Sequence, residues 1–251
     1  TQFSIQRLFS RGNNEAVKSL NLSIESGMIY GFLGTNGAGK TTTIKMLTGQ
    51  LPITSGKAEI LGMNVETNAI RIKSKIGIVP DEPKIYPFFT GYEFIAFILD
   101  VFNKNDKETR NLYDDLCHAF EVDYLQMPIA EMSHGMKQKV MVISVLMRKP
   151  EVIFLDEPTV GLDARSSKIL KDLLRKMANN GATVFLTTHV LEIAQKMCDR
   201  IGILDDGILV AEGTMEELRK RSKMADHTSI EDLFLGLTGQ SEDVLKIVDA
   251  L

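Results

Sequence analysis

The residue types with the clearest chemistry form a glycine-rich stretch near the start of the chain. Its spacing, Gly34-x-x-x-x-Gly39-Lys40-Thr41, is that of a phosphate-binding loop. Glycines let the backbone turn its N–H groups toward an anion at the amino end of a helix. Lys40 then offers a charge to the β- and γ-phosphates, and the Thr41 hydroxyl can ligate Mg²⁺. The sequence predicts an ATP site formed by Gly34, Thr35, Asn36, Gly37, Ala38, Gly39, Lys40, Thr41 and Thr42.

Two other interpretations fit this stretch less well. A glycine-rich turn without a ligand is common, but here an apolar run at 28–33 precedes the loop and a helical pattern at 41–47 follows it. A dinucleotide site requires glycines in the order G-x-G-x-x-G, whereas this loop reads G-x-x-G-x-G. The context therefore favours a phosphate loop between a strand and a helix.

Two adjacent acids follow another apolar run, at 152–155. An acid at the carboxyl end of a buried parallel strand lies in the crevice where ligands bind. We expect Asp156 to hold Mg²⁺, directly or through water, and Glu157 to polarise the attacking water. Paired acids at a strand end can instead cap the next helix, and Asp-Glu-Pro by itself would suggest only that.

A histidine follows the predicted strand at 183–188. His189 would lie at the same edge of the sheet, where its imidazole could reach a γ-phosphate. A single histidine is more often structural or merely exposed. The prediction of a catalytic role for His189 therefore depends on the other motifs.

Alternating strands and helices must position these residues. Helical patterns at 166–179 and 191–197 separate apolar strands, and Asp205-Asp206-Gly207 predicts a hairpin between 201–204 and 208–210. Together with the phosphate loop, the alternation predicts an α/β fold of the P-loop NTPase type, with a mainly parallel core sheet between helices. Alternating polar and apolar residues up to about residue 25 predict an N-terminal antiparallel β subdomain.

A mostly helical block interrupts the predicted core sheet. Helical spacing recurs at 93–101, 109–120 and 133–147. We therefore expect one domain at 1–221, with a core at 1–82 and 150–221, an inserted helical subdomain at 83–149, and a helical tail at 222–251. The pattern of the tail does not assign it a role.

The composition fits an ordinary globular protein, because 44% of the 251 residues are hydrophobic and 25% are charged. A formal net charge of −4 makes a nucleic-acid partner unexpected. The two cysteines, Cys117 and Cys198, form no C-x-x-C pair, which fits a reducing compartment. No apolar run approaches the roughly 18 residues that span a bilayer. We therefore expect a cytoplasmic protein.

The order and spacing of these motifs resemble the ATP-binding subunits of ABC transporters over nearly the whole chain. The segment MSHGMKQK at 132–139 is similar to the family signature, and TVGLD at 159–163 to the loop that touches the partner subunit. His189 matches the switch histidine. The resemblance implies a homodimer, or a paired ATPase subunit, with ATP between one phosphate loop and the other subunit's Ser133 and Gly135. Read alone, Ser133 is an N-cap whose helix dipole suits a phosphate, and a capped surface helix explains the segment equally well.

Three positions depart from the family pattern. His134 replaces the first glycine of the signature, so an imidazole would stand near the expected γ-phosphate. Asp81 stands where the family has a glutamine that links Mg²⁺ to the membrane partner. Its carboxylate could bind the metal, although its reach is shorter. The aromatic residue that stacks on adenine would align near Arg11, with Phe9 close by, and both stay candidates.

The segment PDEPKIYPFFTG at 80–91 resembles bacterial exporter-type subunits. The resemblance implies an integral membrane permease as partner, a peripheral place on the inner face of the cell membrane, and a groove for a coupling helix in the block 83–149. The aromatic residues of that block more often form core than interface; they are Phe88, Phe89, Phe94 and Phe97.

The resulting prediction is an ATPase that drives transport by ATP-dependent dimer closure. One alternative is a soluble ABC-type ATPase that acts on nucleic acid or ribosomes. A single cassette, an insert too short for a coiled coil and an acidic net charge argue against it. A nucleotide-dependent regulator with weak or no hydrolysis is the other alternative, which the altered residues His134 and Asp81 leave open.

Overall fold

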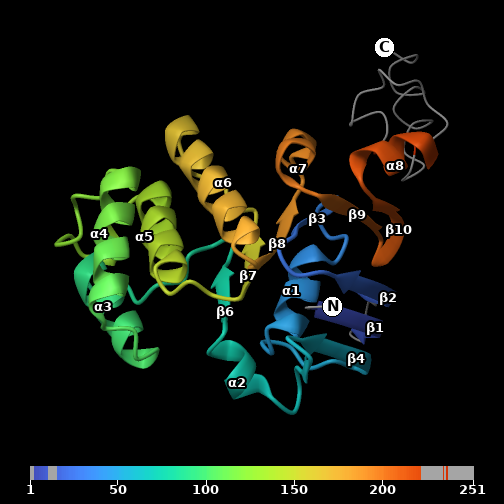
Figure 1. Cartoon of the computed structure of the whole chain (residues 1–251), viewed down its shortest axis with the longest axis horizontal. Coiled ribbons are helices and arrows are strands. Elements are labelled where there is room, and N and C mark those ends of the chain that lie inside the picture. Colours follow the sequence, from blue (N-terminus) through green and yellow to red (C-terminus); the bar gives the residue numbers. More distant parts are fainter. Residues whose placement is uncertain (1–2, 11–15, 222–233, 235, 237–251) are drawn as a thin grey trace.

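The computed structural model describes residues 3–10, 16–221, 234 and 236, arranged as two sheets and surrounding helices (Figure 1). The strands are β1 (Phe3–Ser10), β2 (Val17–Ile24), β3 (Ile29–Gly34), β4 (Ser55–Ile60), β5 (Met63–Asn64), β6 (Ile76–Val79), β7 (Val152–Asp156), β8 (Thr183–Thr188), β9 (Arg200–Asp205) and β10 (Ile208–Gly213). The helices are α1 (Lys40–Leu47), α2 (Ala69–Lys73), α3 (Gly91–Val101), α4 (Lys107–Phe120), α5 (His134–Leu146), α6 (Ala164–Asn179), α7 (Leu191–Met197) and α8 (Met215–Arg221), with a 3-10 turn η1 (Ile129–Glu131).

The larger sheet has six strands in the order β10-β9-β3-β8-β7-β6. All neighbouring strands from β9 to β6 run parallel, and only β10 is antiparallel, through its hairpin with β9. Every residue of β3, β7 and β8 is buried. Strands buried on both faces require continuous apolar runs, which is why these three were recognisable in the sequence. The prediction of a mainly parallel core sheet is confirmed.

The smaller sheet is antiparallel, with the order β2-β1-β4-β5, and confirms the predicted N-terminal β subdomain. Its inner face packs on the core sheet, because the ring of Phe3 lies 6.0 Å from that of Phe154 and 5.8 Å from that of Phe185. The sequence analysis did not identify β4, β5 or α2. In β4 only Ala58 and Ile60 are buried, which leaves too few apolar positions to establish a period.

Helices α3, α4 and α5 lie together at one end of the molecule (Figure 1, left). Each begins at a capping side chain that accepts a hydrogen bond from the first turn: Thr90 for α3, Asp106 for α4 and Ser133 for α5. Asp163 caps α6 in the same way. Buried side chains of these four helices form one core cluster with strands β7 and β8. The cluster thereby holds the amino end of α5 beside the core sheet.

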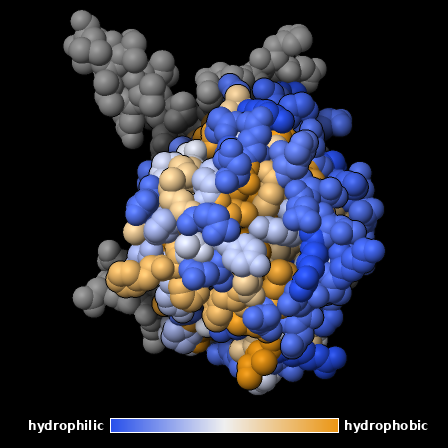
Figure 2. All heavy atoms as spheres, turned by 90° about the vertical axis from the view of Figure 1, so that its left-hand side faces the viewer, coloured by the Kyte–Doolittle hydropathy of each residue, from blue (hydrophilic) through white to orange (hydrophobic). Residues whose placement is uncertain are grey.

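The aromatic residues of the helical block separate into two groups. Phe94 is buried in the core and Phe89 packs against it, whereas Phe88 is 93% exposed and Phe97 is 40% exposed. Figure 2 views the molecule from this end and shows hydrophobic residues at the surface between hydrophilic ones. The expectation that this face belongs mainly to the core therefore does not hold for Phe88.

No helix in the part of the chain that the structure describes is both long and apolar enough to cross a bilayer. Arg11, the side chain of Phe9 and the predicted tail at 222–251 lie outside the described residues, apart from positions 234 and 236. The candidates for adenine stacking and the helical tail therefore stay predictions.

Candidate active site

The phosphate loop connects β3 to α1 along the carboxyl edge of the core sheet. Gly39 directly precedes the helix and has a φ of +106°, in the region that favours glycine. A β-carbon at Gly39 would lie 2.2 Å from the carbonyl oxygen of Ala16. Only glycine therefore lets the loop approach the backbone at Ala16 this closely. The loop faces a pocket of about 170 Å³ that is lined by Asn36, Gly37, Gly39, Lys40, Thr41, Thr42, Asp81, Asp156 and Glu157.

Lys40 is folded back into its own loop. Its ammonium group donates hydrogen bonds to the carbonyl oxygens of Gly34, at 2.8 Å, and Thr35, at 2.9 Å. Burial lowers the pKa of Lys40, while the carboxylates of Glu157 and Asp156 oppose that shift. A cation held by carbonyls and largely removed from water is suited to binding an anion that enters the pocket.

Asp156 ends β7, and two threonine hydroxyls hold its carboxylate. Thr41 donates to Oδ2 at 2.6 Å, and Thr187, its register neighbour on β8, donates to Oδ1. Asp156 is 4% exposed and Thr187 is fully buried. A carboxylate and a hydroxyl that meet at the phosphate loop are the hard oxygen donors that Mg²⁺ prefers. The donor set therefore fits this metal.

Glu157 has an unusual backbone conformation for its residue type. Its φ is +47°, and its N–H donates to the carbonyl of Thr187 at 3.1 Å. The residue is only 9% exposed, and Oε1 lies 2.7 Å from Nδ1 of His189. Oε2 is buried and has no hydrogen-bond partner among the described residues. Glu157 lines the phosphate pocket, and a carboxylate that keeps one oxygen unpaired is suited to receive a proton from water.

Asp81 follows β6 and reaches the site from the side opposite His189. It lines the phosphate pocket together with Thr41 and Asp156, and it also lines an adjoining groove of about 390 Å³. No hydrogen bond or ion pair of Asp81 occurs within the described residues. Its exposed carboxylate lines the same pocket as Thr41 and Asp156, and its role as a metal ligand stays a prediction.

The structure does not bring Ser133 and Gly135 into this pocket. Ser133 caps α5 by accepting a hydrogen bond from the N–H of Met136 at 3.2 Å, and its side chain is exposed. The imidazole of His134 lies against Gly161, where a β-carbon would come within 2.4 Å of Nδ1. The signature and the loop at 159–163 thus form a second surface, apart from the phosphate loop of the same chain.

Sequence reasoning missed two residues of this region. Thr187 was called only a strand residue, although its place next to Asp156 follows once β7 and β8 are paired. Gln138 is completely buried within α5, and its amide approaches the carbonyl of Pro158, just after the paired acids, at 3.5 Å. The place of each residue in the site depends on a residue that is close in space but distant in sequence, which a sequence pattern does not reveal.

Among the described residues, no group of three or more histidine, cysteine, aspartate or glutamate side chains is placed to hold a metal. Such a site would be needed for a metal bound by protein alone. Magnesium in phosphoryl-transfer sites instead takes one or two protein ligands, with phosphate oxygens and water for the rest. The pair Thr41 and Asp156, beside a loop of backbone N–H groups, matches that second arrangement.

The parallel sheet, the phosphate loop and the acidic strand end together define a P-loop nucleotide-binding protein. Comparison with known families narrows this class further, because the sequence model of the ABC transporter family matches residues 17–160. The chain belongs to this family as one of its ATP-binding subunits with ATPase activity.

Similar proteins include three bacterial transporter subunits. The linearmycin resistance ATP-binding protein LnrL of Bacillus subtilis is 35% identical over 84% of this chain and 68% of its own length. The bacitracin transport ATP-binding protein BcrA of Bacillus licheniformis is 34% identical over 84% of the chain and 69% of its own length. The Nod factor export ATP-binding protein I of Burkholderia orbicola is 33% identical over 82% of the chain and 68% of its own length.

Solved structures agree with the fold. An ATP-binding subunit of an ABC transporter superposes with a TM-score of 0.90 at 26% identity, covering 95% of this chain and all of its own. A dimeric post-hydrolysis state of the cassette MJ0796, bound to ADP and phosphate, has a TM-score of 0.77 at 24% identity. It covers 85% of this chain and 98% of its own. At that identity the second likeness concerns the fold alone.

Proposed function

We propose that this chain is the ATP-hydrolysing subunit of a membrane exporter, bound to the inner face of the cell membrane through a permease. The observation that carries the proposal is the pair Asp156 and Glu157. One carboxylate is fixed by two hydroxyls, and the other keeps a buried oxygen without a partner. Relatives named for antibiotic resistance, antibiotic transport and Nod factor export support the direction of transport.

ATP would be held by the backbone and side chains of residues 34–42. The N–H groups at the amino end of α1 and the ammonium of Lys40 would bind the phosphates. Thr41 and Asp156 would ligate Mg²⁺, with Asp81 in reach directly or through water. When bound, Mg²⁺ neutralises phosphate charge as it develops during transfer.

Hydrolysis would depend on Glu157 as the general base. Its oxygen Oε2 would accept a proton from water, and His189 would hold Oε1 so that the carboxylate keeps its orientation. The strained backbone at Glu157 fits such a role, because unusual φ values persist where the surrounding structure fixes a side chain for function. His189 is half exposed and would meet the terminal phosphate from the rim of the site.

A second copy, or a paired ATPase subunit, would complete the site. Ser133 and Gly135 lie at an exposed helix end outside the phosphate pocket of their own chain. In a head-to-tail sandwich they would face the phosphate loop of the partner, and each nucleotide would then join two chains. ATP binding would close the pair and hydrolysis would release it.

The exposed aromatic residues that follow Asp81 in the sequence offer a surface for the permease. Tyr86, Phe88 and Tyr92 are 61%, 93% and 55% exposed, and they follow the segment that lines the phosphate pocket. Exposed aromatic side chains are typical of protein interfaces. A permease segment seated there would sense the state of Asp81 and hence of the nucleotide.

The variant Glu157→Gln tests the hydrolytic part of this proposal. It should keep ATP binding but lower steady-state phosphate release by at least about 100-fold, the usual contribution of a general base. Glu192→Gln is a matched control, because Glu192 is an exposed acid on α7 outside the phosphate pocket. Unchanged turnover in Glu157→Gln would refute the assignment.

Two further measurements test the assembly. With ATP and Mg²⁺, Glu157→Gln should elute from a size-exclusion column as a dimer. Monomer only, while the wild-type protein still turns over ATP, would contradict the sandwich. Purification with the native membrane neighbour should recover a permease, and transport by the reconstituted complex would identify the cargo.

A further inference from the structure

A cavity of about 490 Å³ lies at the opposite edge of the core sheet from the phosphate loop. Its lining includes Glu151 and Ala182, the residues that directly precede β7 and β8, whereas Asp156 and Thr188 end those strands. A strand of five residues spans roughly 17 Å, so the cavity is remote from the predicted nucleotide site. A ligand there would not compete with ATP.

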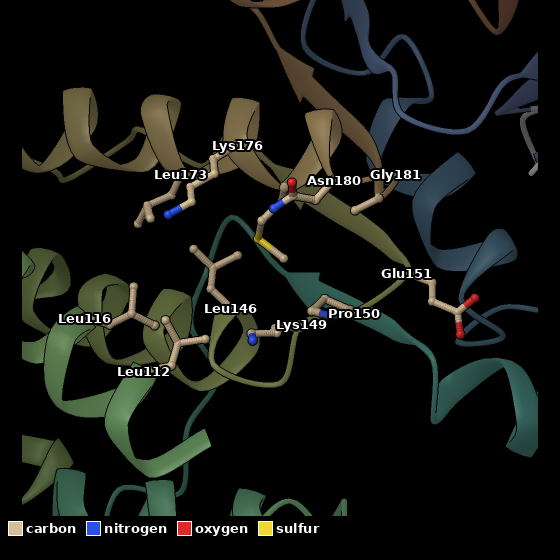
Figure 3. A pocket seen from close by; sticks show the side chains of 12 residues that line it. Leu112, Leu116, Leu146, Lys149, Pro150, Glu151, Leu173, Lys176, Asn180 and Gly181 are labelled. Atoms are coloured by element: carbon tan, nitrogen blue, oxygen red, sulfur yellow. The ribbon is translucent and has the colours of Figure 1, made fainter. Parts of the chain in front are cut away.

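Apolar side chains from three helices form the body of the cavity. Figure 3 shows Leu112 and Leu116 of α4 and Leu146 of α5 on one side, and Leu173 of α6 on the other. Met177 of α6 also lines it. Leu112, Leu173 and Met177 are only partly buried, so apolar surface stays open to a ligand. The volume lies within the range of about 300–1,000 Å³ that small-molecule sites occupy.

Two of the three charged residues that line the cavity are lysines. Lys176 of α6 lines the cavity and takes part in no ion pair among the described residues. Lys149 also lines it and pairs with Glu108, while Glu151 is already matched by Lys75. The unmatched charge at the rim is therefore positive. Charge complementarity selects an anionic group on the ligand, next to an apolar body.

The carboxyl-terminal ends of α5 and α6 line the cavity, whereas their amino-terminal ends face the predicted partner subunit. Helix α5 begins after Ser133 and helix α6 begins after Asp163. Near their beginnings the two helices are tied together, because the ammonium of Lys139 lies 2.9 Å from Oδ2 of Asp163. Helix α5, with 13 residues, is about 20 Å long. A ligand inserted between the carboxyl-terminal ends of α5 and α6 would therefore tilt their amino-terminal ends.

We propose that this cavity is a regulatory site for a small amphipathic anion. The apolar body of the ligand lies among the leucines of α4, α5 and α6, and its anionic end pairs with Lys176. By setting the spacing between α5 and α6, the ligand changes how the signature and the loop at 159–163 meet the partner subunit. This regulatory part rests on the proposed ATPase cycle, whereas binding of the ligand does not.

The binding test uses two matched probes. 8-Anilinonaphthalene-1-sulfonate carries an aromatic body and an anionic group, and N-phenyl-1-naphthylamine is the same body without the sulfonate. The wild-type chain should bind the sulfonate in a saturable way, one per chain, without displacement by ATP. Lys176→Gln should weaken sulfonate binding about five- to tenfold and leave the uncharged probe unchanged. Lys168→Gln, an exposed lysine of the same helix outside the cavity, should bind both probes like the wild type.

Leu173→Gln should weaken both probes at least about tenfold, because it places an amide in the apolar wall. Thermal unfolding of each variant establishes that it is folded. Displacement of the sulfonate by ATP, equal affinity of the two probes for the wild type, or no effect of Lys176→Gln would overturn the site.

Steady-state ATPase tests the regulatory part. The sulfonate should change the turnover of the wild-type protein at least about twofold at saturation, and the concentration that gives half of this change should rise about five- to tenfold in Lys176→Gln. Binding without any change in turnover would overturn regulation and leave the site standing. A wild-type protein without ATPase activity would instead contradict the proposed function, and the binding measurements would still decide the site.

Discussion

The hydrogen bond from Thr187 to Asp156 gives the sharpest test of the site geometry. Thr187→Val replaces a hydroxyl by a methyl group in a fully buried position, and both residues are β-branched, so the strand is preserved. Asp156 is then left with only the hydroxyl of Thr41. A buried charged acceptor without its partner costs about 1–3 kcal/mol or more. For a domain of this size, about 1 kcal/mol lowers Tm by roughly 2–4 °C, so Tm should fall by about 2–12 °C.

Thermal unfolding without nucleotide, followed by circular dichroism, measures this loss. Thr187→Ser keeps the hydroxyl and should retain most of the stability that Thr187→Val loses. The Mg²⁺ concentration for half-maximal ATPase should rise several-fold in Thr187→Val, because the carboxylate orientation is no longer fixed. A wild-type Tm in Thr187→Val would refute the reasoning. Equal losses in the two variants would attribute the effect to packing.

Three other perturbations have expected outcomes. Phe88→Asp should leave the ATPase of the isolated subunit unchanged but lower permease-stimulated ATPase at least about tenfold, since the ring is 93% exposed. His134→Gly should leave ATPase activity intact or raise it, because the backbone N–H matters more than the imidazole; a loss would mean that the imidazole takes part. The N–H of Ser166 and the nearby Lys139 hold the pKa of Asp163 well below its usual range. The folded pKa is lowered, so its stabilisation is present above the ordinary value of 3.8 and is lost as pH falls below it. Asp163→Ala should therefore cost about 1 kcal/mol at pH 7 and less in acid, as measured by urea unfolding.

The elements that the sequence predicted are those whose own residues carry a clear local signal. Strands β3, β7 and β8 are buried on both faces, and their continuous apolar runs are visible without any partner. Helices α3 and α5 were recognisable from their helical spacing, and α5 also from the capping residue Ser133 that precedes it. Strand β4, with only two buried residues, and the short elements β5 and α2 lack such signals, since tertiary contacts rather than periodicity decide them.

The candidate site followed the same rule. Lys40, Asp156 and Glu157 belong to motifs whose spacing is set by a loop or a strand end, so the sequence located them. The role of Thr187 depends on which strand pairs with β7, and the contact of His134 with Gly161 joins two motifs that are 27 positions apart. The opening between α4, α5 and α6 has no motif at all, because it arises from the packing of three helices.

The central claim is that the phosphate loop is only half of its active site. Mixing two inactive variants tests it most directly: Lys40→Ala removes the phosphate-binding charge, and Ser133→Arg blocks the signature. A mixed dimer contains one complete site, formed by the loop of one chain and the signature of the other. The 1:1 mixture should therefore recover up to about one quarter of wild-type ATPase, while each variant alone stays inactive. A mixture as inactive as its two components would contradict the claim.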